Sequence, residues 1–298
     1  MRQCRSVLFA SFGPGRGRAL DAYSCDDVPV YPTRRLAFVI LLTLTACQHK
    51  ETDTGSERTE RSGCETPSVS PGAYVHGVLT VNGLRRTYHL AVPLGDPHAP
   101  RALVLVFHGR GGNGREMRDG IGKALEFAAQ GKALFVYPDG VDNGWPNHEG
   151  KDVAFVDALL HELPRQVCFD PRRIFATGFS YGAIMSNTLG CARGGVIRGI
   201  APMSGAGPRI ACNGTPVAAW ISHGADDRIL PEVAGEGSRD HWVRANGCRS
   251  ESHPTSPPPC VAYEGCGANP VVWCEFPGGH EMPAFVPAAV WKFFEDLT

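Results

Sequence analysis

One five-residue stretch, Gly178-Phe179-Ser180-Tyr181-Gly182, constrains this chain more than any other feature. Residues 173–177 before it are short, apolar and partly β-branched, and they predict a buried strand. Residues 183–189 after it contain no breaker and predict a helix. A Gly-x-Ser-x-Gly turn between a strand and a helix is typical of a nucleophile elbow, although the pattern alone is also compatible with an ordinary tight turn.

Apolar runs and helix-compatible segments alternate along the rest of the chain. Alternation of this kind predicts a mostly parallel sheet with helices on both faces. The first two runs are joined by Asn82-Gly83, a strong hairpin signal, so the N-terminal edge of the sheet is predicted to be antiparallel. This is the layout of an α/β-hydrolase fold. The predicted strands cover residues 75–81, 87–92, 102–107, 133–137, 173–177, 199–203, 217–222 and 271–276, and the predicted helices cover 115–130, 152–163, 181–191, 238–246 and 287–297.

Composition narrows the class of protein. The chain has 29 Lys and Arg against 30 Asp and Glu, so there is no basic surplus to indicate nucleic acid as a partner. The length left after the N-terminal segments matches one large catalytic domain, which we place at residues 64–298. We expect the protein to act as a monomer on an ester substrate.

The N-terminal residues differ from the rest of the chain. Arg34-Arg35 precede an apolar run at 36–44 that is too short to span a bilayer and has the size of a signal-peptide core. The run ends in Leu44-Thr45-Ala46-Cys47, which resembles a bacterial lipobox and makes Cys47 a candidate lipid anchor. An ordinary secretory signal and a transmembrane anchor are the alternatives. We therefore expect an exported bacterial protein, either extracellular or held at the outer surface as a lipoprotein.

Three segments are therefore predicted before the catalytic domain. Residues 1–33 lack any periodicity and form an extension, and we expect the true start to lie near Val28 or Val30. Residues 34–47 form the signal with its lipobox-like end. Residues 48–63 are charged and rich in hydroxyl groups, which predicts a flexible linker.

The cysteines also indicate export. Of the 11 cysteines, Cys4, Cys25 and Cys47 precede the catalytic domain, which leaves an even number within it. In an exported chain this predicts disulfides, although about 100 pairings are possible. A zinc site is the rival interpretation, but the chain has no paired Cys-x-x-Cys and the histidines are not grouped as ligands, so no metal or cofactor is expected. The remaining cysteines are Cys64, Cys168, Cys191, Cys212, Cys248, Cys260, Cys266 and Cys274.

A serine nucleophile needs a base and an acid, which in this fold follow it along the chain in the order acid, then histidine. His280 follows the last predicted strand in a loop that begins Pro277-Gly278-Gly279, so it is the predicted base. Asp227 lies in the turn after the strand at 217–222 and is the preferred acid, with its neighbour Asp226 as the alternative. His108 and His223 stand in His-Gly pairs at strand ends, where a structural role is expected.

The fourth requirement is a pair of backbone N–H groups for the negative oxygen that forms during acyl transfer. The glycine-rich stretch His108-Gly109-Arg110-Gly111-Gly112-Asn113 follows the predicted strand at 102–107. Phosphate binding is the alternative for such a loop, but the spacing and the lysine of a Walker motif are absent. We therefore assign the N–H groups of Arg110 and Tyr181 to the oxyanion hole.

Taken together, these segments resemble feruloyl esterases of carbohydrate esterase family one and their polyhydroxybutyrate-depolymerase-like relatives. The resemblance covers most of residues 64–297, and its most specific parts are Asp-Val-Ala-Phe-Val-Asp at 152–157 and Thr-Gly-Phe-Ser-Tyr-Gly at 177–182. It implies hydrolysis of esters that link ferulic or related hydroxycinnamic acids to plant cell-wall polysaccharide. The chain departs from the pattern at Gly109 and at Glu281-Met282, which leaves the triad intact and the acyl preference open.

Three further interpretations stay open at this point. Trp145 is a candidate to stack on a feruloyl ring or a sugar, but packing of its own loop is equally compatible. The substrate could instead be a short polyester, as for a polyhydroxybutyrate depolymerase, or an acetylated xylan. A non-catalytic surface-binding protein on a hydrolase scaffold is the rival from another class, and the presence of Ser180, Asp227 and His280 together argues against it.

Overall fold

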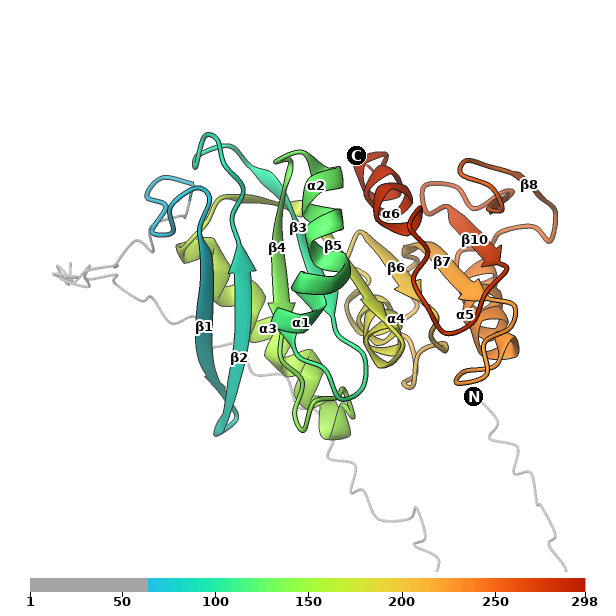
Figure 1. Ribbon diagram of the computed structural model, residues 1–298, viewed down its shortest axis with the longest axis horizontal. Coiled ribbons are helices and arrows are strands. Elements are labelled where there is room, and N and C mark those ends of the chain that lie inside the picture. Colours follow the sequence, from blue (N-terminus) through green and yellow to red (C-terminus); the bar gives the residue numbers. More distant parts are fainter. Residues whose placement is uncertain (1–63, 298) are drawn as a thin grey trace, which may run out of the picture. The chain divides into compact units, whose positions relative to one another are not determined.

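The computed structural model describes residues 64–297, which form one ten-stranded sheet in the order β1-β2-β4-β3-β5-β6-β7-β10-β9-β8 (Figure 1). The predictions for residues 1–33, 34–47 and 48–63, including the lipid anchor at Cys47, lie outside the described residues, as does Thr298. The strands are β1 (Tyr74–Val81), β2 (Leu84–Ala91), β3 (Arg101–Phe107), β4 (Ala133–Pro138), β5 (Phe169–Phe179), β6 (Gly199–Met203), β7 (Ala218–Gly224), β8 (Ser252–Pro254), β9 (Val261–Tyr263) and β10 (Val271–Phe276).

The centre of the sheet is parallel and its first edge is antiparallel, as the sequence predicts. Strands β3, β4, β5, β6, β7 and β10 run parallel to their neighbours in this set. Strands β1 and β2 pair antiparallel through Asn82 and Gly83, whose φ angles of 50° and 78° are those of a tight hairpin turn. The α/β-hydrolase fold is confirmed.

The second edge of the sheet is antiparallel too, which the sequence did not predict. Strands β9 and β8 follow β10 in an antiparallel arrangement, and each has only three residues. Their side chains are half-buried or exposed, so they carry neither the apolar run nor the alternation that marks a strand in sequence.

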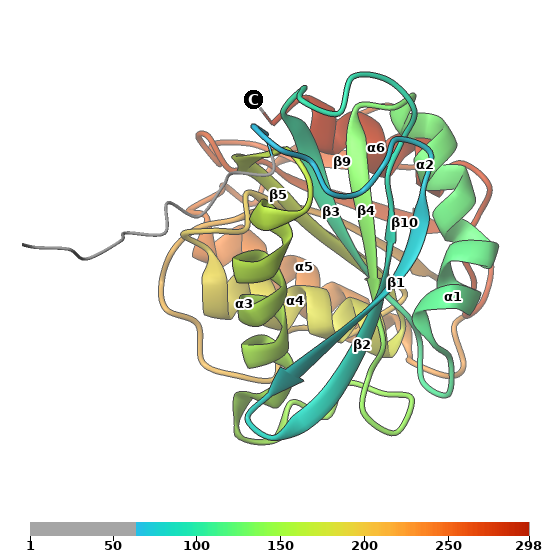
Figure 2. The same cartoon turned by 90° about the vertical axis from the view of Figure 1, so that its left-hand side faces the viewer.

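Helices cover both faces of the sheet (Figure 2). On one face lie α3 (Lys151–Glu162), α4 (Tyr181–Arg193) and α5 (Glu232–Ala245), whose apolar residues, such as Phe155, Leu189 and Trp242, join one core. On the other face lie α1 (Gly114–Met117), α2 (Lys123–Ala129) and α6 (Val286–Glu295), with Leu125 and Phe294 in a second core. The sheet thus separates two apolar layers, and its central strands β3, β4, β6 and β7 are buried on both sides.

Two predicted helices differ from the observed ones at glycines. The single helix predicted over 115–130 is interrupted between α1 and α2, where Gly120 takes a non-helical conformation. Helix α5 begins at Glu232 rather than at residue 238. Gly235 is a helix breaker by propensity, yet a Cβ atom there would lie 2.4 Å from the His223 ring, so close packing requires a glycine in this turn.

The eight cysteines of the described chain form four disulfides, as predicted for an exported domain. The bonds join Cys64 to Cys168, Cys191 to Cys212, Cys248 to Cys266 and Cys260 to Cys274. Among the helices of residues 64–297, none is both long and apolar enough to cross a bilayer.

Candidate active site

The candidate catalytic residues all follow the carboxyl ends of parallel strands. The glycine-rich loop follows β3, Ser180 follows β5, Asp227 follows β7 and His280 follows β10. Carboxyl ends of parallel strands meet at one edge of the sheet, so residues more than one hundred positions apart in sequence converge there. The order of these strands in the sheet, β3-β5-β6-β7-β10, sets their order across the site.

Ser180 occupies a strained turn between β5 and α4. Its φ and ψ angles of 56° and −113° are rare for a residue with a side chain. Both glycines of the motif are required by packing, since a Cβ atom at Gly182 would lie 2.1 Å from the Phe107 carbonyl oxygen and one at Gly178 would lie 2.7 Å from the same atom. The turn therefore holds Ser180 close to the end of β3, as the N-cap residue of the thirteen-residue helix α4.

Asp227 and His280 form a short hydrogen bond. The His280 Nδ1–H donates to Asp227 Oδ2 at 2.7 Å, and the other carboxylate oxygen accepts the backbone N–H groups of Ile229 and Leu230 at 2.8 and 2.9 Å. Asp227 is 5% exposed, whereas the alternative acid, Asp226, is exposed to solvent. The structure thus favours Asp227 over Asp226 as the partner of His280, and it leaves His280 Nε2 as the acceptor.

The Asp227 carboxyl is held in its ionised form. Burial raises its pKa, but the hydrogen bonds from His280, Leu230 and Ile229 lower the pKa by more, so the net pKa lies below that of an ordinary aspartate. A carboxylate in this state keeps the His280 ring oriented and stabilises the imidazolium when it forms.

The turn that carries Asp227 and the loop that carries His280 are joined by backbone contacts. The N–H of Asp226 donates to the Gly278 carbonyl at 2.9 Å, and a Cβ atom at Gly224 would lie 2.3 Å from the Gly279 carbonyl oxygen. Buried Ser204, after β6, donates its hydroxyl to the Glu281 carbonyl at 3.0 Å. No local sequence signal marks Ser204, because its role depends on a partner 77 residues away.

His280 lies beside the residue that precedes the serine. Its ring centroid is 4.7 Å from that of Phe179, and its side chain is 15% exposed. Within residues 64–297, the Ser180 hydroxyl makes no hydrogen bond with His280. Hydrogen bonds of catalytic groups often tighten only when substrate binds, so the placement is compatible with proton transfer between the two.

The glycine-rich loop after β3 is fixed by a buried histidine. His108 Nδ1–H donates to the Gly109 carbonyl at 2.7 Å, while Nε2 accepts the Gly140 N–H at 2.9 Å. Burial lowers the pKa of His108, in agreement with the neutral ring that these two contacts require. The Gly111 N–H donates to the Asn143 carbonyl at 2.8 Å. His108 thus has the structural role expected of it.

His223, the second histidine of a His-Gly pair, is fully buried. Its Nε2–H donates to the Leu230 carbonyl at 2.8 Å and lies 3.4 Å from Asp227 Oδ2. It therefore supports the turn that carries Asp227, again in a structural role.

A cavity of about 270 Å³ opens at the serine. Arg110 and Tyr181, the predicted oxyanion-hole residues, line it together with Ser180. In the part of the chain that the structure describes, the Arg110 N–H donates to no backbone acceptor, and the Tyr181 N–H belongs to the first turn of α4, where helices leave N–H groups free. The other lining residues are Ile184, Arg209, Ile229 and Leu230.

Trp145 lies beneath this loop rather than in the cavity. It is 3% exposed, its Nε1–H donates to the His108 carbonyl at 2.8 Å, and its ring packs edge-on against Phe107 at 5.0 Å. A ring this buried has no free face on which a substrate ring could stack. The structure thus favours the packing alternative for Trp145.

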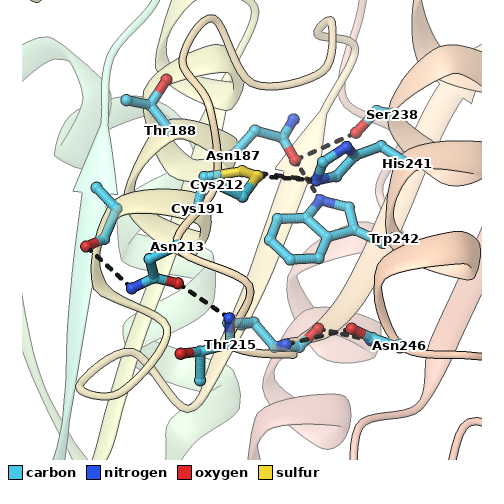
Figure 3. The surroundings of a disulfide bond; sticks show 12 residues. Asn187, Thr188, Cys191, Cys212, Asn213, Thr215, Ser238, His241, Trp242 and Asn246 are labelled. Atoms are coloured by element: carbon cyan, nitrogen blue, oxygen red, sulfur yellow. Dashed lines mark hydrogen bonds between the residues drawn. A yellow bond between two sulfur atoms is a disulfide. The ribbon is translucent and has the colours of Figure 1, made fainter. Parts of the chain in front are cut away.

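The loop after β6 is anchored to α4 and carries a cavity residue that sequence reasoning missed. Asn187 of α4 donates to the Ala206 carbonyl at 2.9 Å and accepts from Trp242 Nε1 at 2.8 Å. The Cys191–Cys212 disulfide fixes the far end of the loop to the same helix (Figure 3). Arg209 lies between these two anchors. Nothing in its local sequence distinguished Arg209 from other surface arginines.

Two groups of side chains in residues 64–297 have donors close enough for a metal ion. One contains Cys191, Cys212 and His241, but both sulfurs belong to a disulfide and are not thiolates. The other contains His76, His89 and Asp139. The expectation that the histidines are not grouped as ligands is wrong for His76 and His89, because the antiparallel pairing of β1 and β2 sets them opposite each other. Neither group lines the cavity at Ser180.

The chain is similar in sequence to known feruloyl esterases. The chain is 36% identical over 237 residues to feruloyl esterase C of Emericella nidulans, covering 74% of this chain and 86% of the relative. It is 32% identical over 260 residues to feruloyl esterase D of Neurospora crassa, covering 78% and 89%. A search of known family descriptions finds no match.

Solved structures show the same fold at low sequence identity. An acetyl xylan esterase from Aspergillus awamori superimposes with a TM-score of 0.58 at 15% identity, covering 74% of this chain and 99% of that one. A ferulic acid esterase from Anaeromyces mucronatus superimposes with a TM-score of 0.56 at 15% identity, covering 76% and 91%.

Fold and relatives together define a carboxylic ester hydrolase with the α/β-hydrolase fold. Within that class, the chain belongs to the feruloyl esterase family, because its identity to these relatives exceeds 30% over most of both chains. The resemblance noted in the sequence is thereby confirmed.

Proposed function

We propose that this protein is a serine feruloyl esterase that releases hydroxycinnamic acids from plant cell-wall polysaccharide. The observation that supports the proposal is the 2.7 Å hydrogen bond from His280 to the buried Asp227, with the His280 ring centroid 4.7 Å from that of Phe179, the residue before Ser180. The names of the relatives supply the substrate class.

In the proposed reaction, His280 Nε2 takes the proton of the Ser180 hydroxyl as its oxygen attacks the ester carbonyl carbon. Asp227 holds the opposite ring nitrogen in its protonated form and stabilises the imidazolium. The negative carbonyl oxygen accepts hydrogen bonds from the N–H groups of Arg110 and Tyr181. The alcohol leaves with the proton from His280, and water then attacks the acyl-enzyme by the same steps to release the acid.

A substrate panel tests the proposal. The purified protein is assayed on methyl ferulate, acetylated xylan, short-chain nitrophenyl esters and polyhydroxybutyrate, each with the Ser180→Ala variant as control. We expect the highest kcat/KM on methyl ferulate and loss of that activity in the variant. Preference for acetylated xylan or for the polyester would change the substrate class, and cleavage of no ester would contradict the proposal.

We also propose that the protein is exported and acts as a monomer. Four disulfides in residues 64–297 support an oxidising compartment. The lipobox-like end at Cys47 supports a lipid anchor at the outer surface of a bacterium, with residues 48–63 as the tether to the catalytic domain. Metabolic labelling with a palmitate analogue, compared between the full chain and its Cys47→Ala variant, tests the anchor.

A further inference from the structure

Two arginines without an acidic partner line the cavity at Ser180. Arg110 comes from the loop after β3 and Arg209 from the loop after β6. Both are exposed, and within residues 64–297 neither guanidinium group makes an ion pair or a side-chain hydrogen bond. Other arginines of the domain, such as Arg193, are paired with a carboxylate. The cavity lining also contains no Asp or Glu.

Both guanidinium groups lie near one ring, that of the residue after the nucleophile. The central carbon of Arg110 is 5.5 Å from the Tyr181 ring centroid, and that of Arg209 is 5.4 Å from it. Contacts of this length are cation–π interactions, which orient an arginine without using its N–H donors. The donors therefore stay available to a ligand in the cavity, where a guanidinium group binds a carboxylate well.

Arg209 is exposed but its loop is anchored. Before Arg209, the Asn187 amide donates to the Ala206 carbonyl. After Arg209, the Cys191–Cys212 disulfide joins the loop to α4 (Figure 3). The Asn213 N–H adds a hydrogen bond to the Cys191 carbonyl at 3.1 Å. A side chain on an anchored loop loses less conformational freedom when it binds a ligand, which favours a binding role.

We propose that Arg110 and Arg209 form an anion subsite for a carboxylate on the substrate. This inference rests on the proposed function. In a hydroxycinnamoyl ester the carboxyl group of the acid is the ester carbonyl itself, and the phenol is neutral near pH 7 because an ordinary phenol has a pKa of about 10. The carboxylate must therefore lie on the alcohol part. The preferred substrates are hydroxycinnamoyl esters of acidic alcohols, such as uronic acids or carboxylated cyclitols.

A matched pair of substrates tests the subsite. Chlorogenate joins caffeic acid to quinate, whose carboxylate is negative, and methyl chlorogenate is the same ester with that charge removed. The measured quantity is the ratio of kcat/KM for caffeate release from the two. We expect the wild type to prefer chlorogenate, mainly through a lower KM, and the preference to fall as salt is raised from about 0.01 M to about 0.5 M, because salt screens exposed charges.

Variants assign the effect to the two arginines. Arg209→Gln and Arg110→Gln should each lower the ratio about fivefold, the size expected when one partly exposed charged hydrogen bond is lost. Arg209→Lys should retain part of the preference. Arg172→Gln is the matched control, since it removes the same charge near the opposite end of β5, where the side chain is 87% exposed.

The outcomes separate the subsite from the proposed function. An equal ratio in the wild type, Arg209→Gln and Arg172→Gln, with methyl ferulate still cleaved, would overturn the subsite alone. Cleavage of methyl ferulate but of neither chlorogenate ester would also overturn it, because the cavity would then reject such alcohols. No cleavage of any hydroxycinnamoyl ester would overturn the proposed function and the subsite with it. If Arg209→Gln fails to fold, two measurements still test the subsite. They are the salt dependence of the chlorogenate preference in the wild type and the preference of the Arg209→Lys variant.

Discussion

The catalytic end of the sheet and its β9–β8 edge are held in place by different means. At the catalytic end, buried parallel strands fix the loops, and backbone contacts such as that from Asp226 to Gly278 join one loop to the next. At the β9–β8 edge, the strands are three residues long and little buried, and the Cys248–Cys266 and Cys260–Cys274 disulfides join them to the domain. The comparison indicates that the sheet topology positions the catalytic residues. The β9–β8 edge buries few apolar side chains and is stabilised by disulfides instead.

The largest expected effect is at the catalytic end. Ser180→Ala removes the nucleophile and should lower kcat on methyl ferulate by about 10⁴-fold or more. The thermal midpoint should stay close to that of the wild type, because the turn is held by Gly178 and Gly182 rather than by the hydroxyl. Steady-state kinetics and a thermal melt on the same preparation check both. Turnover near that of the wild type would exclude Ser180 as the nucleophile.

The next effect distinguishes the two adjacent acids. Asp227→Asn should lower kcat by about 10³- to 10⁴-fold, because an amide at this position favours the wrong tautomer of His280. Asp226→Asn makes the same change one residue away on an exposed side chain and should leave kcat near that of the wild type. The measurement is kcat of the two variants at one pH. A large loss in Asp226→Asn with none in Asp227→Asn would assign the catalytic acid to Asp226.

A smaller effect is expected at the β9–β8 edge. The Cys248→Ala, Cys266→Ala double variant should lower the free energy of unfolding by about 2–4 kcal/mol, because the bond closes a loop of 18 residues. Below the unfolding transition, kcat on methyl ferulate should match the wild type. Denaturant titration gives the first quantity. A parallel loss of kcat in fully folded protein would show that this edge also positions the catalytic residues.

The smallest effect concerns acid stability. The pKa of Asp227 is lower in the folded protein than the ordinary value of about 3.9, so its ionised form stabilises the fold above about pH 4. This stabilisation is lost as pH falls through the lowered pKa. Between about pH 4 and pH 2, the free energy of unfolding should therefore fall more steeply for the wild type than for Asp227→Asn. Equal slopes in urea titrations would contradict the lowered pKa.

Much of the catalytic end could be predicted from sequence because its signals are local. The turn at Ser180, the loop at His108 and the glycines before His280 each follow a continuous apolar run. The order of those runs is enough to place the three loops at one edge of a parallel sheet. The choice of Asp227 over Asp226, which rested on the resemblance to related enzymes, agrees with the observed hydrogen bond from His280.

The remaining features depend on contacts that are distant in sequence. From the sequence, Trp145 is an aromatic residue near the predicted active site. Only the packing of Phe107 and His108 around it shows that it is buried. The start of α5 depends on Gly235 meeting His223 across the fold. The pairing of the cysteines and the cavity position of Arg209 are set by the same kind of long-range contact.

The most direct test of the central claim is capture of the acyl-enzyme. The protein is mixed with methyl ferulate, quenched in acid within the first turnovers, digested and analysed by mass spectrometry. We predict a feruloyl group on the peptide that contains Ser180, and none in the Ser180→Ala variant. A feruloyl group on another residue, or steady release of ferulate by the variant, would contradict the account.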